Sequence, residues 1–252
     1  METTPLFAVR ALSKSYGGRT VLASLDFDVR RGECFIIMGR SGSGKSVALR
    51  QLNVLERPDS GSVTFDGAVI SHLTEKALKP IRKRVAMLFQ GAALFDSMTV
   101  FDNVAFPLRE HLDLSRADLE QRVKKHLALV GLVDIEEKMP AALSGGMKKR
   151  VALARSIALD PEAVLFDEPT TGLDPRTSAT IARLIQATQE KLGVTSVVVT
   201  HDLVLARRVG DRVAFLHDGT FRFVGTWDEA GHSSDRELGK FLAGEADIDD
   251  VE

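Results

Sequence analysis

The 252-residue sequence predicts an α/β fold with a core of mostly parallel sheet, an N-terminal antiparallel β subdomain and an inserted α-helical subdomain. Two observations carry this prediction. Short, continuous apolar runs such as Val164–Phe166 and Ser196–Thr200 alternate with helical segments, which is typical of strands buried on both faces of a parallel sheet. Residues 101–131 instead place apolar side chains at helical spacing between charges, which indicates helices.

The N-terminal part, residues 6–38, has the pattern of β structure. Apolar and charged residues alternate through Leu25–Arg30, the period of a half-buried strand. Tyr16–Gly18 interrupts the pattern as a turn. Cys34–Met38 is apolar throughout, so we expect a strand there that is buried on both faces.

The remaining elements follow from the same signals. We expect a helix over Lys45–Glu56, strands at Val63–Phe65 and Val85–Phe89, and a closing hairpin of Asp211–Leu216 with Thr220–Gly225. The end of the chain carries five carboxylates among eight residues, which is typical of a solvated tail. The predicted organisation is one domain over 1–244, with a helical insertion at about 91–160, and an acidic tail over 245–252.

Composition narrows the functional classes. The chain has 33 basic and 35 acidic residues and a net charge of −2, so no overall electrostatic attraction to nucleic acid is expected. With Cys34 as the single cysteine, no internal disulfide can form, which favours a reducing compartment. The first residues do not resemble a signal peptide, and the apolar runs fall short of the roughly 20 residues that a membrane span needs. Any role at a membrane therefore requires a partner.

The strongest motif is GRSGSGKS at Gly39–Ser46, which follows an apolar strand and opens a helix. Its glycines let backbone N–H groups wrap a phosphate without side-chain clashes, and the N-terminus of the helix faces the anion. Lys45 is expected to neutralise the β- and γ-phosphates, and the Ser46 hydroxyl to ligate Mg²⁺. The candidate phosphate-binding residues are Gly39, Arg40, Ser41, Gly42, Ser43, Gly44, Lys45, Ser46 and Val47.

A pair of carboxylates ends the apolar strand AVLFDE at Ala163–Glu168. In a chain with a phosphate-binding loop, Asp167 is placed to hold Mg²⁺ through water, and Glu168 to polarise the attacking water. Without such a loop, an Asp–Glu pair at a strand end is usually only a solvated loop entry.

A second candidate anion site is LSGGM at Leu143–Met147, where Ser144 suits a helix N-cap and Gly145 and Gly146 leave backbone N–H groups open. One reading is a capped helix after a loop. The other is a site completed by a neighbouring copy, because one chain hardly needs two anion-binding helix starts for one nucleotide. His201 and Gln90 each follow a predicted strand of the same series, and His201 can donate a hydrogen bond to a terminal phosphate.

The ordered set Tyr16, GRSGSGKS, Gln90, LSGGM, AVLFDE, TGLD and His201 resembles the nucleotide-binding subunit of ABC transporters over nearly the whole chain. The resemblance implies a P-loop NTPase core, the ABC ATPase cassette, in which Tyr16 stacks on adenine. It implies that Gln90 touches Mg²⁺ and senses the permease, and that His201 acts as the switch histidine. Ser144–Gly146 would cap ATP bound to the opposite copy, with Asp174 as the D-loop aspartate. An ATPase with ATP and Mg²⁺, working as a head-to-tail dimer, is the expected enzyme.

A narrower resemblance joins SGGM to residues 88–111, which together are similar to the ATPase of Mla-type lipid-transport systems. Most ABC ATPases carry Gln where this chain has Met147. The lipid-transport resemblance implies a membrane permease and an MCE-domain lipid-binding protein as partners, with a small regulatory subunit as a further candidate. It places the chain at the cytoplasmic face of the inner membrane, driving phospholipid transport. Phe89, Leu94, Phe95, Met98 and Phe101 are expected either to contact the permease or to form the core of the helical insertion.

Three alternatives stay open at this point. A small-solute importer would use the same motif set. A soluble ABC ATPase acting on DNA or ribosomes is disfavoured, because only 96 residues separate Ser46 from Leu143 and they contain no heptad repeat. A catalytically dead cassette conflicts with intact Lys45, Asp167, Glu168 and His201.

Overall fold

A computed structural model describes residues 4–245, which divide into two compact units. The first unit comprises the chain up to Lys79 together with the chain from Thr195 onward, and the second is Pro80–Val194. The predicted acidic tail over 245–252 lies outside the described residues except for Glu245.

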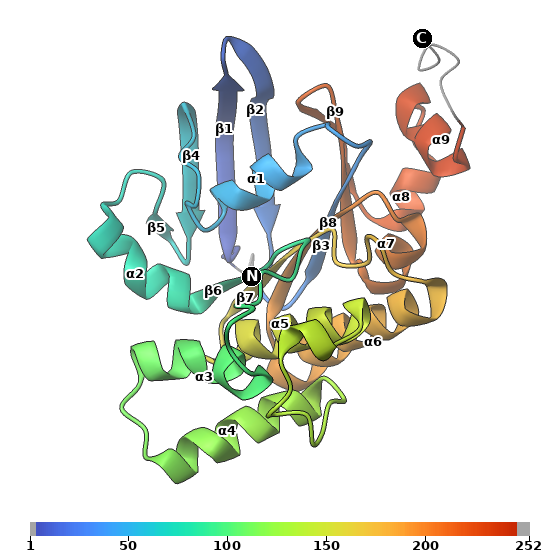
Figure 1. Ribbon diagram of the computed structural model, residues 1–252. Helices are drawn as coiled ribbons and strands as arrows, with labels where there is room; N and C mark the ends of the chain where they lie inside the picture. The colour runs from blue at the N-terminus through green and yellow to red at the C-terminus, as the bar shows by residue number, and fades with distance from the viewer. Residues whose placement is uncertain (1–3, 246–252) are drawn as a thin grey trace. The chain divides into compact units, whose positions relative to one another are not determined.

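An antiparallel sheet forms much of the N-terminal part of the first unit (Figure 1). Its strands are β1 (Phe7–Tyr16), β2 (Arg19–Val29), β4 (Ser60–Phe65) and β5 (Ala68–Val69), in the order β2-β1-β4-β5. The turn expected at Tyr16–Gly18 joins β1 to β2, and Asp66–Gly67 joins β4 to β5. These strands alternate buried and exposed side chains, as the period-two sequence pattern predicts.

The first unit also holds β3 (Cys34–Met38), β8 (Thr195–Thr200), β9 (Arg212–His217) and β10 (Thr220–Gly225). β3 pairs in parallel with both β8 and β9, and β9 pairs antiparallel with β10. Every residue of β3 and β8 is buried, which explains the apolar runs Cys34–Met38 and Val197–Val199. The helices of this unit are α1 (Lys45–Gln51), α7 (Leu203–Val209), α8 (Trp227–Gly231) and α9 (Arg236–Ala243).

The helix predicted over Lys45–Glu56 is shorter than expected, since α1 ends at Gln51. Beyond Gln51 the backbone turns, and Val54 adopts a φ of 53° that no α-helix accepts. The amides of Leu55 and Glu56 both return to the carbonyl of Arg50, which closes this turn.

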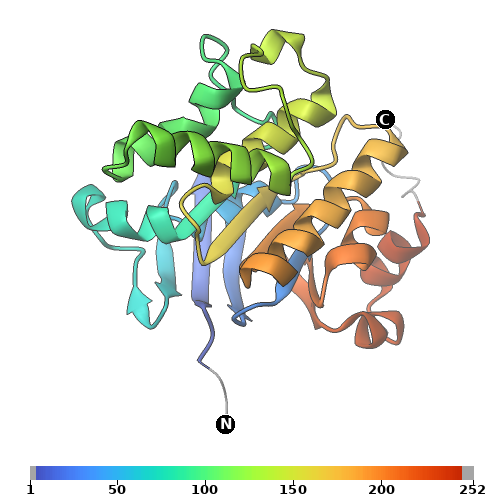
Figure 2. The same cartoon turned by 90° about the horizontal axis from the view of Figure 1, so that it is seen from below.

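Helix α2 (Glu75–Arg84) carries the chain into the second unit, where β6 (Val85–Leu88) pairs in parallel with β7 (Ala163–Asp167). Between them lie α3 (Val100–His111), α4 (Arg116–Leu129), the 3₁₀ turn η1 (Pro140–Ala142) and α5 (Gly145–Ile157). α6 (Pro175–Leu192) follows β7. Figure 2 shows the green and yellow-green helices α3, α4 and α5 gathered together, and each of them contacts the other two. The predicted α/β class, with an antiparallel sheet, mostly parallel pairing elsewhere and inserted helices, is confirmed.

Among the described residues, no helix combines the length and the apolar character needed to cross a bilayer.

Candidate nucleotide-binding and hydrolysis site

The phosphate loop of the first unit connects the buried strand β3 to α1, as its sequence predicts. Gly42 and Gly44 have φ angles of 77° and 99°, which side-chain-bearing residues rarely adopt. A Cβ atom on Gly39 would lie 2.3 Å from the carbonyl oxygen of Leu216 and 2.9 Å from Ser43 Oγ. The loop therefore needs glycine for its backbone path as well as for access to a ligand.

Lys45 is 5% exposed and folds back over the loop. Its Nζ donates to the carbonyl oxygens of Gly39, at 2.9 Å, and Arg40, at 2.8 Å. Ser43 Oγ is buried and makes no hydrogen bond within the described part of the chain. The loop thus carries a buried ammonium and a hydroxyl without a partner among the described residues. Both groups can donate hydrogen bonds to the oxygens of a phosphate, which the loop backbone can surround.

A pocket of about 410 Å³ adjoins the phosphate loop within the same unit. This size lies within the range of small-molecule sites. Its lining comes from the start of β2, from the phosphate loop and from the β9–β10 turn: Arg19, Thr20, Val21, Gly42, Ser43, Asp218 and Gly219.

Tyr16 ends β1 and is 45% exposed. Its hydroxyl donates to the carboxylate of Glu56, and Lys14 Nζ lies 5.4 Å from the centre of its ring. Partial burial, followed by the hydrogen bond and charge of Glu56, raises the pKa of Tyr16 to about 12. Glu56, which the sequence analysis did not single out, thus holds the predicted adenine-stacking ring in place.

His201 and the phosphate loop lie at the same edge of the first unit's parallel strands. Met38 at the end of β3 is in register with Thr200 at the end of β8, so Gly39 and His201 follow paired residues. Parallel strands present their carboxyl ends at one edge, where ligands bind in open α/β sheets. His201 is exposed there, and the next residue, Asp202, caps α7.

The second unit brings Gln90, Asp167 and Glu168 together in the same way. Leu88 of β6 is in register with Phe166 of β7, so the three residues follow a paired position at one edge. Asp167 is 3% exposed and Glu168 is 8% exposed, whereas Gln90 is exposed. Thr171 Oγ1 lies 3.4 Å from Glu168 Oε2.

The signature segment forms the start of α5, as expected. Ser144 is the N-cap, and its Oγ accepts from the amide of Met147 at 3.3 Å. Ser144 and Gly145 are exposed, while Gly146 is buried against Thr177 of α6. The exposed N-terminus of a 13-residue helix can receive an anion from outside the unit.

Asp174 is the N-cap of α6, and both of its carboxylate oxygens accept hydrogen bonds from that helix. Its Oδ1 accepts from the amides of Arg176 and Thr177, each at 3.0 Å, and its Oδ2 from the Thr177 hydroxyl at 2.5 Å. The hydrogen bond from the Thr177 side chain is the main cause that lowers the pKa of Asp174. In this chain the D-loop aspartate therefore has a structural role as a helix cap.

Lys149 is a functional candidate that the sequence analysis did not single out as a site residue. It is 6% exposed and contacts the loop that carries Glu168. Its position on α5, three residues after Gly146 and four before Leu153, places it on the buried helix face. A lysine on an otherwise apolar face is the sequence signal that identifies it.

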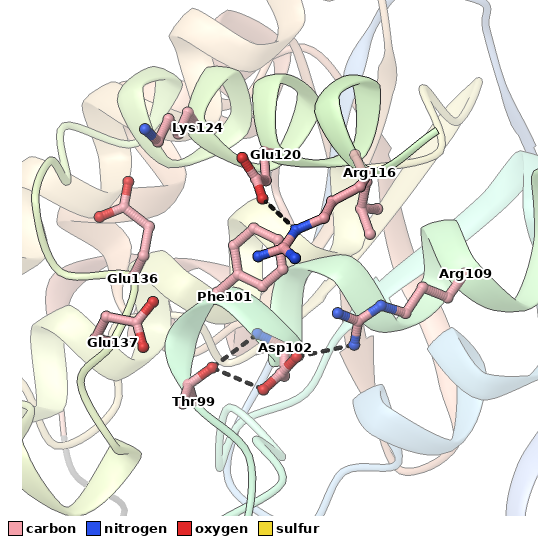
Figure 3. A pocket seen from close by; sticks show the side chains of 10 residues that line it. Thr99, Phe101, Asp102, Arg109, Arg116, Glu120, Lys124, Glu136 and Glu137 are labelled. Atoms are coloured by element: carbon pink, nitrogen blue, oxygen red, sulfur yellow. Dashed lines mark hydrogen bonds and ion pairs between the residues drawn. The ribbon is translucent and has the colours of Figure 1, made fainter. Parts of the chain in front are cut away.

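A further pocket, of about 710 Å³, lies in the second unit and contains none of the residues predicted for nucleotide binding or hydrolysis (Figure 3). Its charges are partly paired: Asp102 with Arg109 at 2.8 Å, and Glu120 with Arg116 at 3.0 Å. Phe101 lies between these pairs, and Glu136 and Glu137 form the opposite wall. The lining is mixed in charge and has no glycine-rich backbone, so it lacks the features of a phosphate site.

The fold, the phosphate loop with His201, and the group of Gln90, Asp167 and Glu168 define an ATP-binding cassette ATPase. The family profile for ABC transporters matches residues 22–171, and the chain belongs to this family. As a member of this family, it is an ATP-binding protein and an ATPase.

Two groups of curated relatives are similar over nearly the whole chain. The intermembrane phospholipid transport system ATP-binding protein MlaF of Haemophilus influenzae is 40% identical over 96% of this chain and 92% of its own length. MlaF of Escherichia coli K12 is 41% identical over 96% and 90%. The methionine import ATP-binding protein MetN 1 of Listeria monocytogenes is 39% identical over 97% of this chain and 73% of its own length.

Solved ATP-binding cassettes have the same fold. A dimeric cassette in a post-hydrolysis state, bound to ADP and Pi, has a TM-score of 0.81 and is 32% identical over 87% of this chain and 98% of that one. The cbiO1 protein of Clostridium perfringens, part of an ABC transporter complex, has a TM-score of 0.83 and 29% identity over 94% and 95%.

Proposed function

We propose that this ATPase works as a head-to-tail dimer that drives a membrane permease, and that the transported substrate is phospholipid. The phosphate loop of one copy would face Ser144–Gly146 of the other. Support comes from the exposed signature helix start and from the dimeric state of the similar cassette.

In this proposal each copy supplies the residues of hydrolysis. Lys45 and the loop amides bind the β- and γ-phosphates, Tyr16 stacks on adenine, and Glu168 orients water for in-line attack. His201 donates to the terminal phosphate. The proposed ligands of Mg²⁺ are the Ser46 hydroxyl, the Gln90 amide oxygen and the Asp167 carboxylate. These hard oxygen donors suit the ion, which would neutralise the charge that develops on the phosphate.

The observation that carries the coupling to a permease is an aromatic groove of about 380 Å³ in the second unit. We define this aromatic groove by three side chains, Phe89, Phe95 and Phe106, which are 38%, 41% and 37% exposed. Phe95 and Phe106 lie 4.9 Å apart, and Arg155 covers the Phe95 ring at 5.6 Å. Clustered exposed aromatic side chains of this kind mark interaction sites.

The five apolar residues considered for the insertion core are absent from that core. Phe89 and Phe95 are exposed, and Leu94, Met98 and Phe101 are partly exposed. The core of this region is formed instead by Val100, Val104, Ala105 and Leu108 of α3. This placement favours the permease-contact interpretation.

A buried side chain, Asn103, holds the loop beside the groove. Its Nδ2 donates to the carbonyls of Phe95 and Met98, each at 3.1 Å, and of Thr99 at 3.0 Å. Its Oδ1 accepts from the Phe95 amide at 2.9 Å. The loop from Phe95 to Thr99 is therefore preorganised, which reduces the entropic cost of docking a partner.

Phospholipid is favoured as the substrate by SGGM together with residues 88–111, the segment that resembles Mla-type ATPases. The similarity to MlaF agrees with it. An MCE-domain lipid-binding protein and a small regulatory subunit complete the proposed partners, with the chain at the cytoplasmic face of the inner membrane. Methionine or another small solute is the second candidate, because MetN relatives are equally similar.

The coupling is tested by copurification of an integral membrane protein with the tagged chain in detergent. Phe95→Asp is expected to abolish copurification, because it places a charge in the aromatic groove. The control Val133→Asp alters another exposed apolar residue of the second unit, 66% exposed, and should retain the partner. Equal recovery of the membrane protein with both variants would rule out the groove as the contact.

The substrate is tested by mass spectrometry of the intact complex purified in detergent. Phospholipid enriched above its level in a mock purification, together with an MCE-domain protein, is the expected result. A periplasmic-type solute-binding partner, with methionine and no enriched phospholipid, would overturn the lipid assignment in favour of import.

A further inference from the structure

Lys149 of α5 is buried, although lysine is almost never fully buried unless its ammonium has partners. It lies on the helix face that also buries Gly146 and Leu153. Burial lowers the pKa of the ammonium, while the charge of Glu168 raises it. Removing such a group from water is favourable only when its N–H donors are satisfied.

The partners of Lys149 all belong to one backbone turn. Its Nζ donates to the carbonyl of Pro169 at 2.8 Å, of Thr171 at 2.9 Å and, more weakly, of Glu168 at 3.4 Å. An ammonium has three N–H donors, so this turn takes all of them. The lysine thus binds backbone atoms whose positions set the path of the chain just after β7.

The backbone at Glu168 needs such support. Its φ is 45°, in the left-handed region that is strained for an L-residue. Conformations of this kind persist only where the surroundings hold them. The amide of Thr171 returns to the Glu168 carbonyl at 3.3 Å, and Lys149 binds the same carbonyl together with those of Pro169 and Thr171.

We propose that Lys149 is a positioning residue for ATP hydrolysis, which holds residues 168–171 so that the Glu168 side chain points in the direction that the reaction needs. The inference rests on the proposed role of Glu168 in orienting water. The inference also connects Glu168 to the signature segment, because Lys149 lies on α5, the helix that begins at Ser144–Gly146. Engagement of the signature by the opposite copy's ATP therefore acts on the turn that carries this copy's Glu168.

The first test compares steady-state ATP hydrolysis by full-length variants. Lys149→Met removes all three donors while keeping a long side chain, and should lower kcat by on the order of 10–100-fold, because small misplacements of catalytic groups cost this much. The KM for ATP should stay within about twofold, since the hydrogen bonds of Lys149 go to the turn at residues 168–171, which is proposed to act in hydrolysis and not in nucleotide binding. Lys149→Arg and Lys149→Gln, which keep N–H donors, should recover part of the rate. Lys148→Met, a neighbour on the same helix, is the matched control and should hydrolyse ATP like the wild type.

The second test separates positioning from general support of the fold. If Lys149 acts through Glu168, adding Lys149→Met to Glu168→Gln should slow single-turnover hydrolysis no further, because both changes remove one effect. A residue that only supports the fold would give multiplied losses, and that result would overturn the proposal. So would a folded Lys149→Met with wild-type kcat. If Lys149→Met does not fold, the hydrolysis rates of Lys149→Gln and Lys149→Arg decide. If both variants fold and bind ATP normally but neither hydrolyses ATP faster than a tenth of the wild-type rate, the N–H donors of residue 149 do not position the turn.

The role of Glu168 is tested independently by Glu168→Gln alone. Turnover near the wild-type rate in that variant would remove the proposed role of Glu168. Wild-type turnover in Lys149→Met would remove only the positioning inference.

Discussion

Glu168 lies at the end of a fully buried strand, is itself nearly buried, and has a left-handed backbone conformation. Such conformations concentrate at functional sites. We expect Glu168→Gln to bind ATP with unchanged affinity but to reduce turnover by at least about 10²-fold, the loss typical of a missing general base. Equilibrium nucleotide binding and a phosphate-release assay measure the two quantities. Gel filtration with ATP should show the variant as a stable dimer, and a monomer under these conditions would contradict the shared site.

His126 makes stability depend on pH. The ring is buried, with Nδ1 donating to the Arg122 carbonyl at 2.8 Å and Nε2 3.6 Å from Asp160. Burial is the main cause that lowers the pKa of His126 below its ordinary value near 6.5. Below about pH 6.5 the histidine is therefore protonated in the unfolded chain but still neutral in the folded chain. The free energy of unfolding consequently decreases as the pH falls below about 6.5.

Urea unfolding at pH 7.5 and pH 5.5 measures this effect. The drop in the free energy of unfolding between the two should be smaller in His126→Leu than in the wild type. His232→Gln, which changes an exposed histidine, is the control and should retain the wild-type drop. An unchanged drop in His126→Leu would show that other groups cause the pH dependence.

At the scale of single residues, the sequence identifies the functional residues that belong to a local sequence motif. Gly39 and the Asp167–Glu168 pair lie where the motifs predict, at the ends of buried parallel strands, and Lys45 begins the helix after the phosphate loop. Glu56 and Lys149 are different, because they act through tertiary contacts with Tyr16 and with the turn after β7. No local motif encodes such contacts, although a lysine on an apolar helix face is a usable signal.

At the scale of elements, the packing of α5 on α6 depends on Gly146. A Cβ at this position would lie 2.4 Å from Thr177 Cγ2, whereas a Cβ on Gly145 would have its nearest neighbour 3.7 Å away. Gly146→Ala should therefore destabilise the chain relative to Gly145→Ala by about 1–3 kcal/mol, the usual cost of overpacking. Thermal and chemical unfolding of both variants check the difference.

Rescue by Thr177→Ser distinguishes this clash from a loss of glycine flexibility. Serine removes the methyl group that a Cβ on Gly146 would strike, and keeps the hydroxyl that donates to Asp174. The double variant Gly146→Ala with Thr177→Ser should regain most of the lost stability. Purely additive losses would show that the methyl group is not the obstacle.

Element types follow from the sequence more reliably than element ends. The continuous apolar runs correspond to the buried strands β3, β7 and β8, because a strand covered on both faces is mostly apolar. The predicted helix from Lys45 ended five residues early, since Leu52–Glu56 forms a turn that propensity alone does not reveal. The aromatic residues after Gln90 were ambiguous, because a groove and a core have the same composition.

At the scale of the whole molecule, the head-to-tail dimer predicts complementation between two inactive variants. Lys45→Ala loses the phosphate contact but keeps its signature, and Ser144→Arg blocks the signature but keeps its phosphate loop. Mixed dimers contain one intact composite site, so the mixture should hydrolyse ATP faster than the sum of the separate variants. Phosphate release at equal total protein measures this, and a rate equal to the sum would contradict the shared site.

The assembly is also the level at which the sequence is least informative. Resemblance of Ser144–Gly146 to a signature implies a second copy, whereas the sequence bears on the transported molecule only through the resemblance of SGGM and residues 88–111 to Mla-type ATPases. In the proposed assembly the permease would select the substrate, and its sequence is separate. The nearly equal similarity to MlaF and MetN 1 agrees with this, since their names describe ATP-binding proteins of two different transport systems.

The anchoring of the loop by Asn103 has a consequence for how such a subunit changes its partner in evolution. One buried side chain, through four hydrogen bonds, fixes the backbone from Phe95 to Thr99. The exposed residues between them, Asp96 and Ser97, can then mutate without altering the shape of the loop. A lineage can thus exchange the side chains that a permease meets while inheriting the same docking geometry, which lets one ATPase be matched to a new membrane protein by few substitutions.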